Sequence, residues 1–217
     1  TLRIASAQLN PTVGDVAGNL ALVREYRAMA AEAGADLVIF PELMLLGYPP
    51  EDLVLKPAAI RACEEALDAL AQDDGPAILV GTPWNDDGKL RNGVALIDEG
   101  AVQALRFKCE LPNYAVFDEK RVFEAGAMPD PVAWRGVKIG LPICEDIWFE
   151  RVPRHLAARG AEALRRGGYD GPLTIVGDEA HRPYDRPQLS KYVLSGDLEA
   201  DATALPQCVP LGARWRL

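Results

Sequence analysis

Three residue types that together support covalent catalysis occur at comparable places in this chain, each directly after an apolar run. Glu42 ends the run DLVIFPE, Lys108 ends AVQALRFK, and Cys144 ends GVKIGLPIC. A thiolate is a strong nucleophile, a nearby carboxylate can take the thiol proton, and an ammonium can stabilise an oxyanion. The three residues therefore predict cleavage of an amide through a thioester, with ammonia as the leaving group.

The backbone N–H of Glu145, directly after the thiol, is a second candidate donor to the oxyanion. One such donor typically lowers the barrier by about 3 kcal/mol. The chain has only two histidines, so few residues could activate a nucleophile in the way that histidine does. Ordinary alternatives exist, because a cysteine at a strand end is usually structural and a lysine there is usually solvated. Spacing alone does not decide between catalysis and these alternatives.

The composition is typical of a globular protein that binds neither nucleic acid nor membrane. Hydrophobic residues make up 49% of the chain and charged residues 25%, which is ordinary for globular domains. The net charge of −9 argues against the basic face that nucleic acid requires, and no apolar stretch approaches a membrane span. The opening TLRIASAQLNP lacks the pattern of a secretory signal. We therefore expect a cytoplasmic location.

The four cysteines show neither CxxC spacing nor a Cys/His zinc pattern. We expect reduced thiols and no metal site. Cys63 shares the apolar face of a predicted helix, so we interpret it as a core residue. Cys109 points to the opposite side of its strand from Lys108, which favours packing over chemistry.

Apolar runs alternate with helical patterns, which predicts a layered α/β domain. The candidate strands are 2–9, 36–40, 77–81, 93–97, 102–107, 137–143 and 173–176. Strands between 77 and 107 follow one another through the short loops NDDGKLRN and DEGA. We therefore expect antiparallel pairs there and a mixed sheet overall.

Three helices are predicted from capping residues and periodicity. Asp15 is a good N-cap for a helix that ends near Ala33. Pro57 suits the first position of a second helix, and a third is expected over about 150–166. From about Gly167 the periodic pattern weakens and the sequence becomes rich in proline and polar residues.

Three longer motifs resemble the nitrilase, or carbon–nitrogen hydrolase, superfamily. They are FPELMLLGYPPEDLVLKPA, RFKCELPNYAVFDEKRVF and GLPICEDIW. Within them, GYPPEDLVLKP and LPNYAVFDEKR resemble more narrowly the glutamine amidase domain of glutamine-dependent NAD synthetases. The resemblance covers about residues 1–162. It implies a nitrilase-like α-β-β-α sandwich with mixed sheets, and hydrolysis of glutamine to glutamate and ammonia without a cofactor.

The resemblance also implies roles for individual residues. Glu42 would be the general base, Lys108 the oxyanion-stabilising amine, and Cys144 the nucleophile that forms the glutamyl thioester. Glu119, in VFDEK, would be a second acid that orients Lys108 and the substrate. The alternative for Glu119 is a surface acid in a charged cluster.

Two further residues match positions that line the glutamine pocket in that family, namely Tyr48 and Glu145. The alternative for Tyr48 is a half-buried packing residue. The family's sandwich continues beyond the matched part with a serine that holds the glutamine α-carboxylate. We therefore expect the sandwich to be incomplete at its C-terminal side, and residues 163–217 to form an irregular tail.

This tail resembles an internal piece of the FAD-dependent ferredoxin reductases, most specifically in PYDRPQLSK. By that resemblance Glu179 would face the adenosine ribose, and Arg186 and Lys191 would approach the pyrophosphate and flavin. No G-x-G-x-x-G turn precedes the acid, so the backbone has no means of approaching a pyrophosphate closely. We therefore expect no FAD binding.

Three hypotheses follow for the whole chain. The favoured one is a cysteine amidase that acts on glutamine. The second is a truncated or chimeric remnant with impaired catalysis, and the third is a reductase fragment. The ATP-dependent NAD synthetase domain is absent from this sequence, so NAD formation would take place on another chain. Intact family members form large homo-oligomers. The resemblance leaves open whether this chain forms a homo-oligomer, because the interface can require elements of the missing half of the sandwich.

Overall fold

The computed structural model of the chain describes residues 2–166, 174–176 and 214–216. The contacts divide the chain into two compact units, Thr1–Ala161 and Glu162–Leu217. Each unit is described by itself. Glu179, Arg186 and Lys191 lie outside the described residues, and the assignment of 163–217 to a separate tail stays a prediction.

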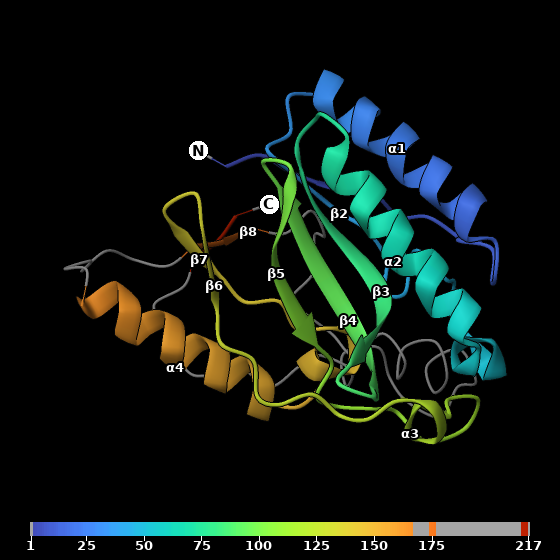
Figure 1. The fold of residues 1–217 in the computed structure, drawn as a ribbon. Helices are drawn as coiled ribbons and strands as arrows, with labels where there is room; N and C mark the ends of the chain where they lie inside the picture. The colour runs from blue at the N-terminus through green and yellow to red at the C-terminus, as the bar shows by residue number, and fades with distance from the viewer. Residues whose placement is uncertain (1, 167–173, 177–213, 217) are drawn as a thin grey trace, which may run out of the picture. The chain divides into compact units, whose positions relative to one another are not determined.

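A five-stranded mixed sheet forms the centre of the first unit (Figure 1). Its strands are β1 (Ile4–Ser6), β2 (Leu37–Ile39), β3 (Ala77–Asp86), β4 (Lys89–Asp98) and β5 (Ala101–Phe107), in that order across the sheet. The pairs β1–β2 and β2–β3 are parallel, and the pairs β3–β4 and β4–β5 are antiparallel. The predicted mixed sheet with an antiparallel half is confirmed.

The predicted loop over 85–92 is wrong, because β3 and β4 continue through it as a hairpin. The turn is centred on Asp87 and Gly88, whose φ angles are +51° and +82°. An Asp-Gly pair favours this tight left-handed turn, which matches the twist of the flanking strands. As a result, β4 begins at Lys89 and places Asn92 inside the sheet.

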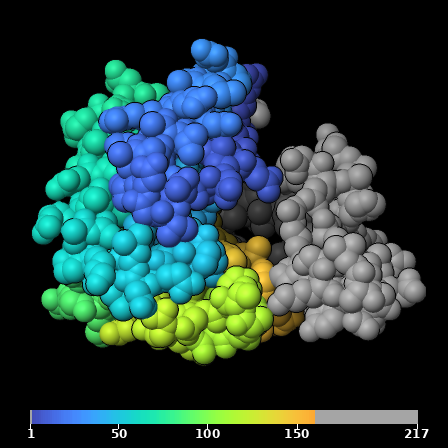
Figure 2. All heavy atoms as spheres, turned by 90° about the vertical axis from the view of Figure 1, so that its right-hand side faces the viewer, coloured from blue at the N-terminus to red at the C-terminus, as the bar shows by residue number. Residues whose placement is uncertain are grey.

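Two helices cover one face of the sheet. Helix α1 is Val16–Glu32, with the side chain of Asp15 accepting the N–H of Gly18 at 2.9 Å, and α2 is Pro57–Gln72. Both helix starts were predicted correctly. The buried side chains between helices and sheet include Val23, Ile60, Cys63, Leu67, Leu70, Val38, Ile78, Val80 and Ile97. In the space-filling view α1 (blue) and α2 (cyan) form one continuous surface (Figure 2).

The opposite face of the sheet is covered by a small hairpin. Its strands are β6 (Val132–Trp134) and β7 (Val137–Ile139), which pair antiparallel. Trp134 packs with Leu79 and Leu96 of the central sheet. Helix α4 (Arg151–Arg166) follows, and its Val152 packs with Cys109. The first unit therefore has a helix layer, a large sheet and a small sheet (Figure 1).

Three short helical segments complete the described chain. They are η1 (Glu51–Leu55), α3 (Glu119–Val122) and η2 (Cys144–Ile147). In the second unit, β8 (Thr174–Val176) and β9 (Arg214–Arg216) pair in parallel.

Within the described ranges, no helix combines the length and the apolar character needed to cross a membrane.

Candidate active site

Glu42 lies in the turn after β2, and the apolar residues that follow it anchor this turn. Residues 43–46 are each 0% exposed. The turn lies directly against β3 at Gly81, where a Cβ would stand 2.3 Å from the backbone N of Leu43. Leu45 donates its N–H to the carbonyl of Gly81 at 3.1 Å. A glycine at this position is therefore what lets the turn hold Glu42 close to the sheet.

Lys108 directly follows β5, and its side chain is completely buried. Its Nζ lies 2.6 Å from Oε1 of Glu42 and 2.8 Å from Oε1 of Glu119. Its backbone is held on both sides, because its N–H donates to Asn92 at 2.8 Å and its C=O accepts from Gly126 at 2.7 Å. The lysine is therefore an internal cation between two carboxylates and is not solvated.

Cys144 begins η2 at a φ of +45°, in the left-handed region that residues with a side chain seldom adopt. The predicted strand to Ile143 is too long, since β7 ends at Ile139. Pro142 has no N–H to donate to a ladder, and the N–H of Ile143 donates to Asp146 at 3.0 Å. The thiol is therefore presented by a tight turn, and the residue is solvent-exposed.

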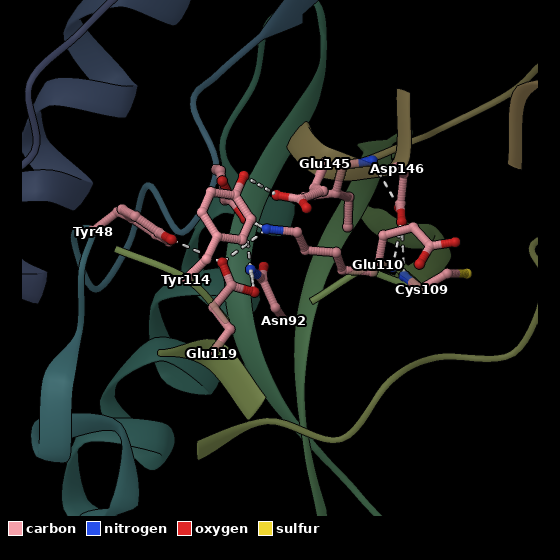
Figure 3. A network of polar contacts seen from close by, with 11 residues as sticks. Tyr48, Asn92, Cys109, Glu110, Tyr114, Glu119, Glu145 and Asp146 are labelled. Carbon is pink, nitrogen blue, oxygen red and sulfur yellow. Dashed lines mark hydrogen bonds and ion pairs between the residues drawn. The ribbon is translucent and has the colours of Figure 1, made fainter. Parts of the chain in front are cut away.

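Asp146 connects this turn to the end of β5. Its Oδ1 accepts the backbone N–H groups of Cys109 at 2.9 Å and Glu110 at 2.8 Å. Figure 3 shows this carboxylate directed at the backbone of Cys109 and Glu110. Its Oδ2 also accepts the N–H of Ile143. Burial raises the pKa of Asp146 despite these three hydrogen bonds.

The electrostatic environment keeps the thiol of Cys144 protonated. Burial raises its pKa to about 12, the charge of Glu42 and a hydrogen bond to that side chain act in the same direction, and Lys108 opposes them. The residue is exposed as a whole, while its sulfur lies against these charged groups. Activation of the thiol therefore requires a proton acceptor, and Glu42 is the carboxylate bonded to it.

Lys108, Glu119 and Glu42 form a cluster of three charged groups, in which Lys108 and Glu119 each shift the pKa of the other and Glu42 shifts both. Burial disfavours the ammonium of Lys108, but the two carboxylates outweigh burial and raise its pKa. Burial also raises the pKa of Glu119, and Glu42 adds to this effect while Lys108 opposes it. Glu119 is only 3% exposed, so it is not a surface acid.

Tyr48 and Tyr114 each donate a hydrogen bond to one of the acids. The hydroxyl of Tyr48 lies 2.9 Å from Oε1 of Glu119, and that of Tyr114 lies 2.9 Å from Oε2 of Glu145. Burial and the charge of Glu119 raise the pKa of Tyr48. Figure 3 shows both tyrosines directed toward the same centre.

The structure thus brings together the predicted residues of the first unit. They are Glu42, Tyr48, Lys108, Glu119, Cys144 and Glu145. Sequence reasoning missed Asn92, Tyr114 and Asp146. Asn92 had a signal, since it is a polar residue just before an apolar strand, but it was assigned to a loop.

Comparison with known proteins finds a family match and several similar sequences. Residues 3–183 match the family described as carbon-nitrogen hydrolase. The glutamine-dependent NAD(+) synthetase of Rhodobacter capsulatus is 44% identical over 185 residues, which cover 81% of this chain and 34% of that protein. The protein of the same name from Synechocystis is 44% identical over 154 residues, covering 67% of this chain and 28% of the relative. The chain spans about a third of the length of such relatives.

Similar solved structures include both a synthetase and an amidase. The glutamine-dependent NAD+ synthetase of Acinetobacter baumannii, in complex with ADP, gives a TM-score of 0.69 at 31% identity, covering 90% of this chain and 35% of that one. An amidase from Nesterenkonia gives 0.68 at 28% identity, covering 90% and 71%. Another structure of that amidase shows acrylamide added to the active-site cysteine. The predicted fold class is confirmed by these structures.

One expectation is corrected by the family match. We expected the resemblance to carbon–nitrogen hydrolases to stop near Glu162 and to give way to a piece of a ferredoxin reductase. The matched region instead continues to residue 183 and includes Glu179. The comparisons give no support to the reductase-like tail, and most of PYDRPQLSK, residues 183–191, lies beyond the matched region.

Proposed function

This chain belongs to the carbon–nitrogen hydrolase family, and from that premise we propose that it hydrolyses the side-chain amide of glutamine through a thioester at Cys144. The observation that carries the proposal is the buried ammonium of Lys108, bonded to Glu42 and Glu119 beside an exposed thiol. The 44% sequence identity to a glutamine-dependent NAD synthetase supports glutamine as the substrate. The acrylamide adduct of the Nesterenkonia amidase supports a cysteine nucleophile.

In the first step the thiol proton moves from Sγ of Cys144 to Glu42 while the sulfur attacks the amide carbon. The carbonyl oxygen becomes an oxyanion. The ammonium of Lys108 and the backbone N–H of Glu145 stabilise this charge, and such fixed donors are most effective where water is excluded. A pKa of the thiol near 12 makes this transfer to a bonded base necessary near neutral pH.

In the second step the tetrahedral intermediate collapses. The C–N bond breaks, the proton held by Glu42 moves to the leaving nitrogen, and ammonia departs from the glutamyl thioester. Water then attacks the thioester carbon and gives a proton to Glu42. Glutamate leaves as the C–S bond breaks, and the proton returns from Glu42 to the sulfur, which restores the starting state. These steps use only side-chain and backbone groups of this chain and water, without a cofactor.

The remaining site residues position these groups. Glu119 holds Lys108 together with Glu42, and Tyr48 donates its hydroxyl hydrogen to Glu119. Glu145 lines the substrate pocket and is itself oriented by Tyr114. Neither tyrosine needs to lose its proton for this task.

We place the reaction in NAD synthesis by the same similarity. Ammonia released here would serve an ATP-dependent synthetase domain. Relatives more than twice as long as this chain have room for such a domain. A homo-oligomeric assembly and a cytoplasmic location stay predictions.

The test is the release of ammonia from glutamine by the purified chain and by a Cys144→Ala variant. We expect turnover by the former and loss of about 10⁴-fold or more in the latter, because removal of a covalent nucleophile has effects of this size or larger. Equal rates would contradict the proposal. A folded chain without turnover would favour the impaired remnant instead.

A further inference from the structure

Asn92 is a buried residue of β4 that contacts three members of the site. It is 1% exposed. Its Nδ2 lies 2.7 Å from Oε1 of Glu42 and 3.4 Å from Oε2 of Glu119 (Figure 3). Its backbone carbonyl accepts the N–H of Lys108 at 2.8 Å. The same residue therefore fixes the lysine backbone and touches both carboxylates.

The two carboxylates determine which end of the Asn92 amide faces them. An amide oxygen in this place would lie against two acceptor groups, whereas the NH₂ can donate to both. The other end, Oδ1, is buried and has no hydrogen-bond partner among the described residues. A buried acceptor without a partner costs about 1–3 kcal/mol. Hydrogen bonds to charged groups contribute about 1.5–3 kcal/mol, so the bonds of the NH₂ end to the carboxylates offset this cost, and the role of the amide lies at that end.

The donor geometry around Glu42 defines this role. Lys108 and Asn92 both reach the same oxygen, Oε1, at 2.6 Å and 2.7 Å. Two donors on one oxygen fix the plane of a carboxylate. They leave Oε2 as the oxygen that can take the proton of Cys144.

We propose that Asn92 is a positioning residue for proton transfer, which holds Glu42 so that Oε2 is presented to the thiol of Cys144. The inference rests on the proposed role of Glu42 as the base. Because the amide is neutral, it orients Glu42 without adding a second positive charge beside it. A second cation in this place would stabilise the carboxylate further and weaken it as a proton acceptor.

The test uses Asn92→Ala and Asn92→Leu, which both remove the donor without adding a charge, while Asn92→Leu keeps a similar volume. Two rates are measured: turnover of glutamine, and alkylation of Cys144 by iodoacetamide, assigned by peptide mapping. We expect kcat to fall by about 10- to 100-fold, as for other small displacements of a catalytic group, with KM changed by less than about threefold. Alkylation of Cys144 should slow by a similar factor.

Asp98→Ala is the control. Asp98 is buried at the other end of β4 (5% exposed), and its carboxylate accepts the side chains of Trp134 and Arg135, away from the site. Thermal unfolding followed by circular dichroism establishes which variants are folded. We expect Asp98→Ala to lose stability while its folded protein keeps kcat and the alkylation rate.

Three outcomes would overturn the inference. They are unchanged rates in folded Asn92 variants, equal losses in the Asn92 and Asp98 variants, and failure of both Asn92 variants to fold, which would make Asn92 a structural residue. The alkylation arm also separates this inference from the proposed function. If the original chain does not hydrolyse glutamine but Asn92→Ala still slows alkylation of Cys144, the substrate is wrong and the positioning role stands.

Discussion

The buried carboxylate of Asp146 accepts the backbone N–H of Cys109 at 2.9 Å, and this contact joins the turn of the thiol to the strand of the lysine. Cys144 lies two residues before Asp146, and Lys108 lies one residue before Cys109. The separation between nucleophile and cation therefore depends on one carboxylate that takes no part in the proposed chemistry.

Replacement Asp146→Asn should damage both stability and activity. The substitution turns one acceptor oxygen into a donor, so at least one of the three backbone N–H groups on Asp146 loses its partner. We expect the free energy of unfolding to fall by about 1–3 kcal/mol and kcat to fall with it. Urea denaturation and ammonia release measure the two effects. Asp15→Asn is the control, because asparagine caps a helix about as well as aspartate, and equal effects of both changes would contradict the account.

Replacement Gly81→Ala should displace the turn of Glu42. The new Cβ would stand 2.3 Å from the backbone N of Leu43, a separation that requires the backbone to move. Since misplacement of a catalytic group by about 1 Å can cost about 100-fold, we expect a comparable loss of kcat. Gly88→Ala is the control: its φ is +82° in open space, so it should strain the hairpin but leave the kcat of the folded enzyme unchanged. Equal kcat in both variants would count against the account.

Replacement Lys108→Met should be strongly destabilising. It leaves the carboxylates of Glu42 and Glu119 side by side without their shared cation, and breaking a buried ion pair in this way costs about 3–5 kcal/mol. Urea denaturation gives the difference. Lys89→Met is the control, because Lys89 is 55% exposed and 3.8 Å from its partner, and such surface changes stay within about 0.5 kcal/mol. A loss for Lys108→Met no larger than that of the control would show that the cluster is not coupled.

The buried thiol of Cys63 should make the protein less stable at alkaline pH. Burial raises its pKa to about 12 from a reference of 9.0, with Glu64 acting in the same direction. Between these values the unfolded chain releases the thiol proton and the folded chain keeps it. The contribution of the buried Cys63 thiol to the free energy of unfolding is therefore fully present below pH 9.0. It is lost as the pH rises toward 12, by up to about 1.4 kcal/mol per pH unit.

Urea midpoints measured at several values between about pH 8 and pH 10.5 would show this slope. We expect Cys63→Ala to be less stable throughout, because it leaves a cavity, but to have a shallower dependence on pH. Part of the dependence of stability on pH remains in that variant, because burial also raises the pKa of Cys109, to about 11. A slope unaffected by Cys63→Ala would contradict the prediction.

Helix starts, the mixed sheet and the meeting of Glu42, Lys108 and Cys144 at one site could be predicted because each has a local signal. Asp15 and Pro57 mark helix ends by their own backbone chemistry, and apolar runs mark strands. Glu42, Lys108 and Cys144 each follow such a run, so their meeting at one site required only that strand ends lie together. The motifs around them then gave the family.

Other parts of the site depend on contacts between distant segments, which a local pattern does not show. The carboxylate of Asp146 bonds the backbone at Cys109, 37 residues earlier, and Asn92, whose local signal is only a polar residue beside an apolar run, reaches Glu42 across 50 residues. The end of β7 at Ile139 was missed for the same reason, because an apolar run does not reveal that Ile143 donates to a side chain. The reductase-like tail rested on one short motif, and the comparisons give it no support.

The central claim is that Cys144 carries the glutamyl group during turnover. The most direct measurement is intact-mass analysis of the protein quenched in acid during reaction with glutamine, followed by peptide mapping. We predict a mass increase equal to one glutamyl group, located on the peptide of Cys144 and absent from the Cys144→Ala variant. Ammonia release without any such adduct, or with the adduct on another cysteine, would contradict the account.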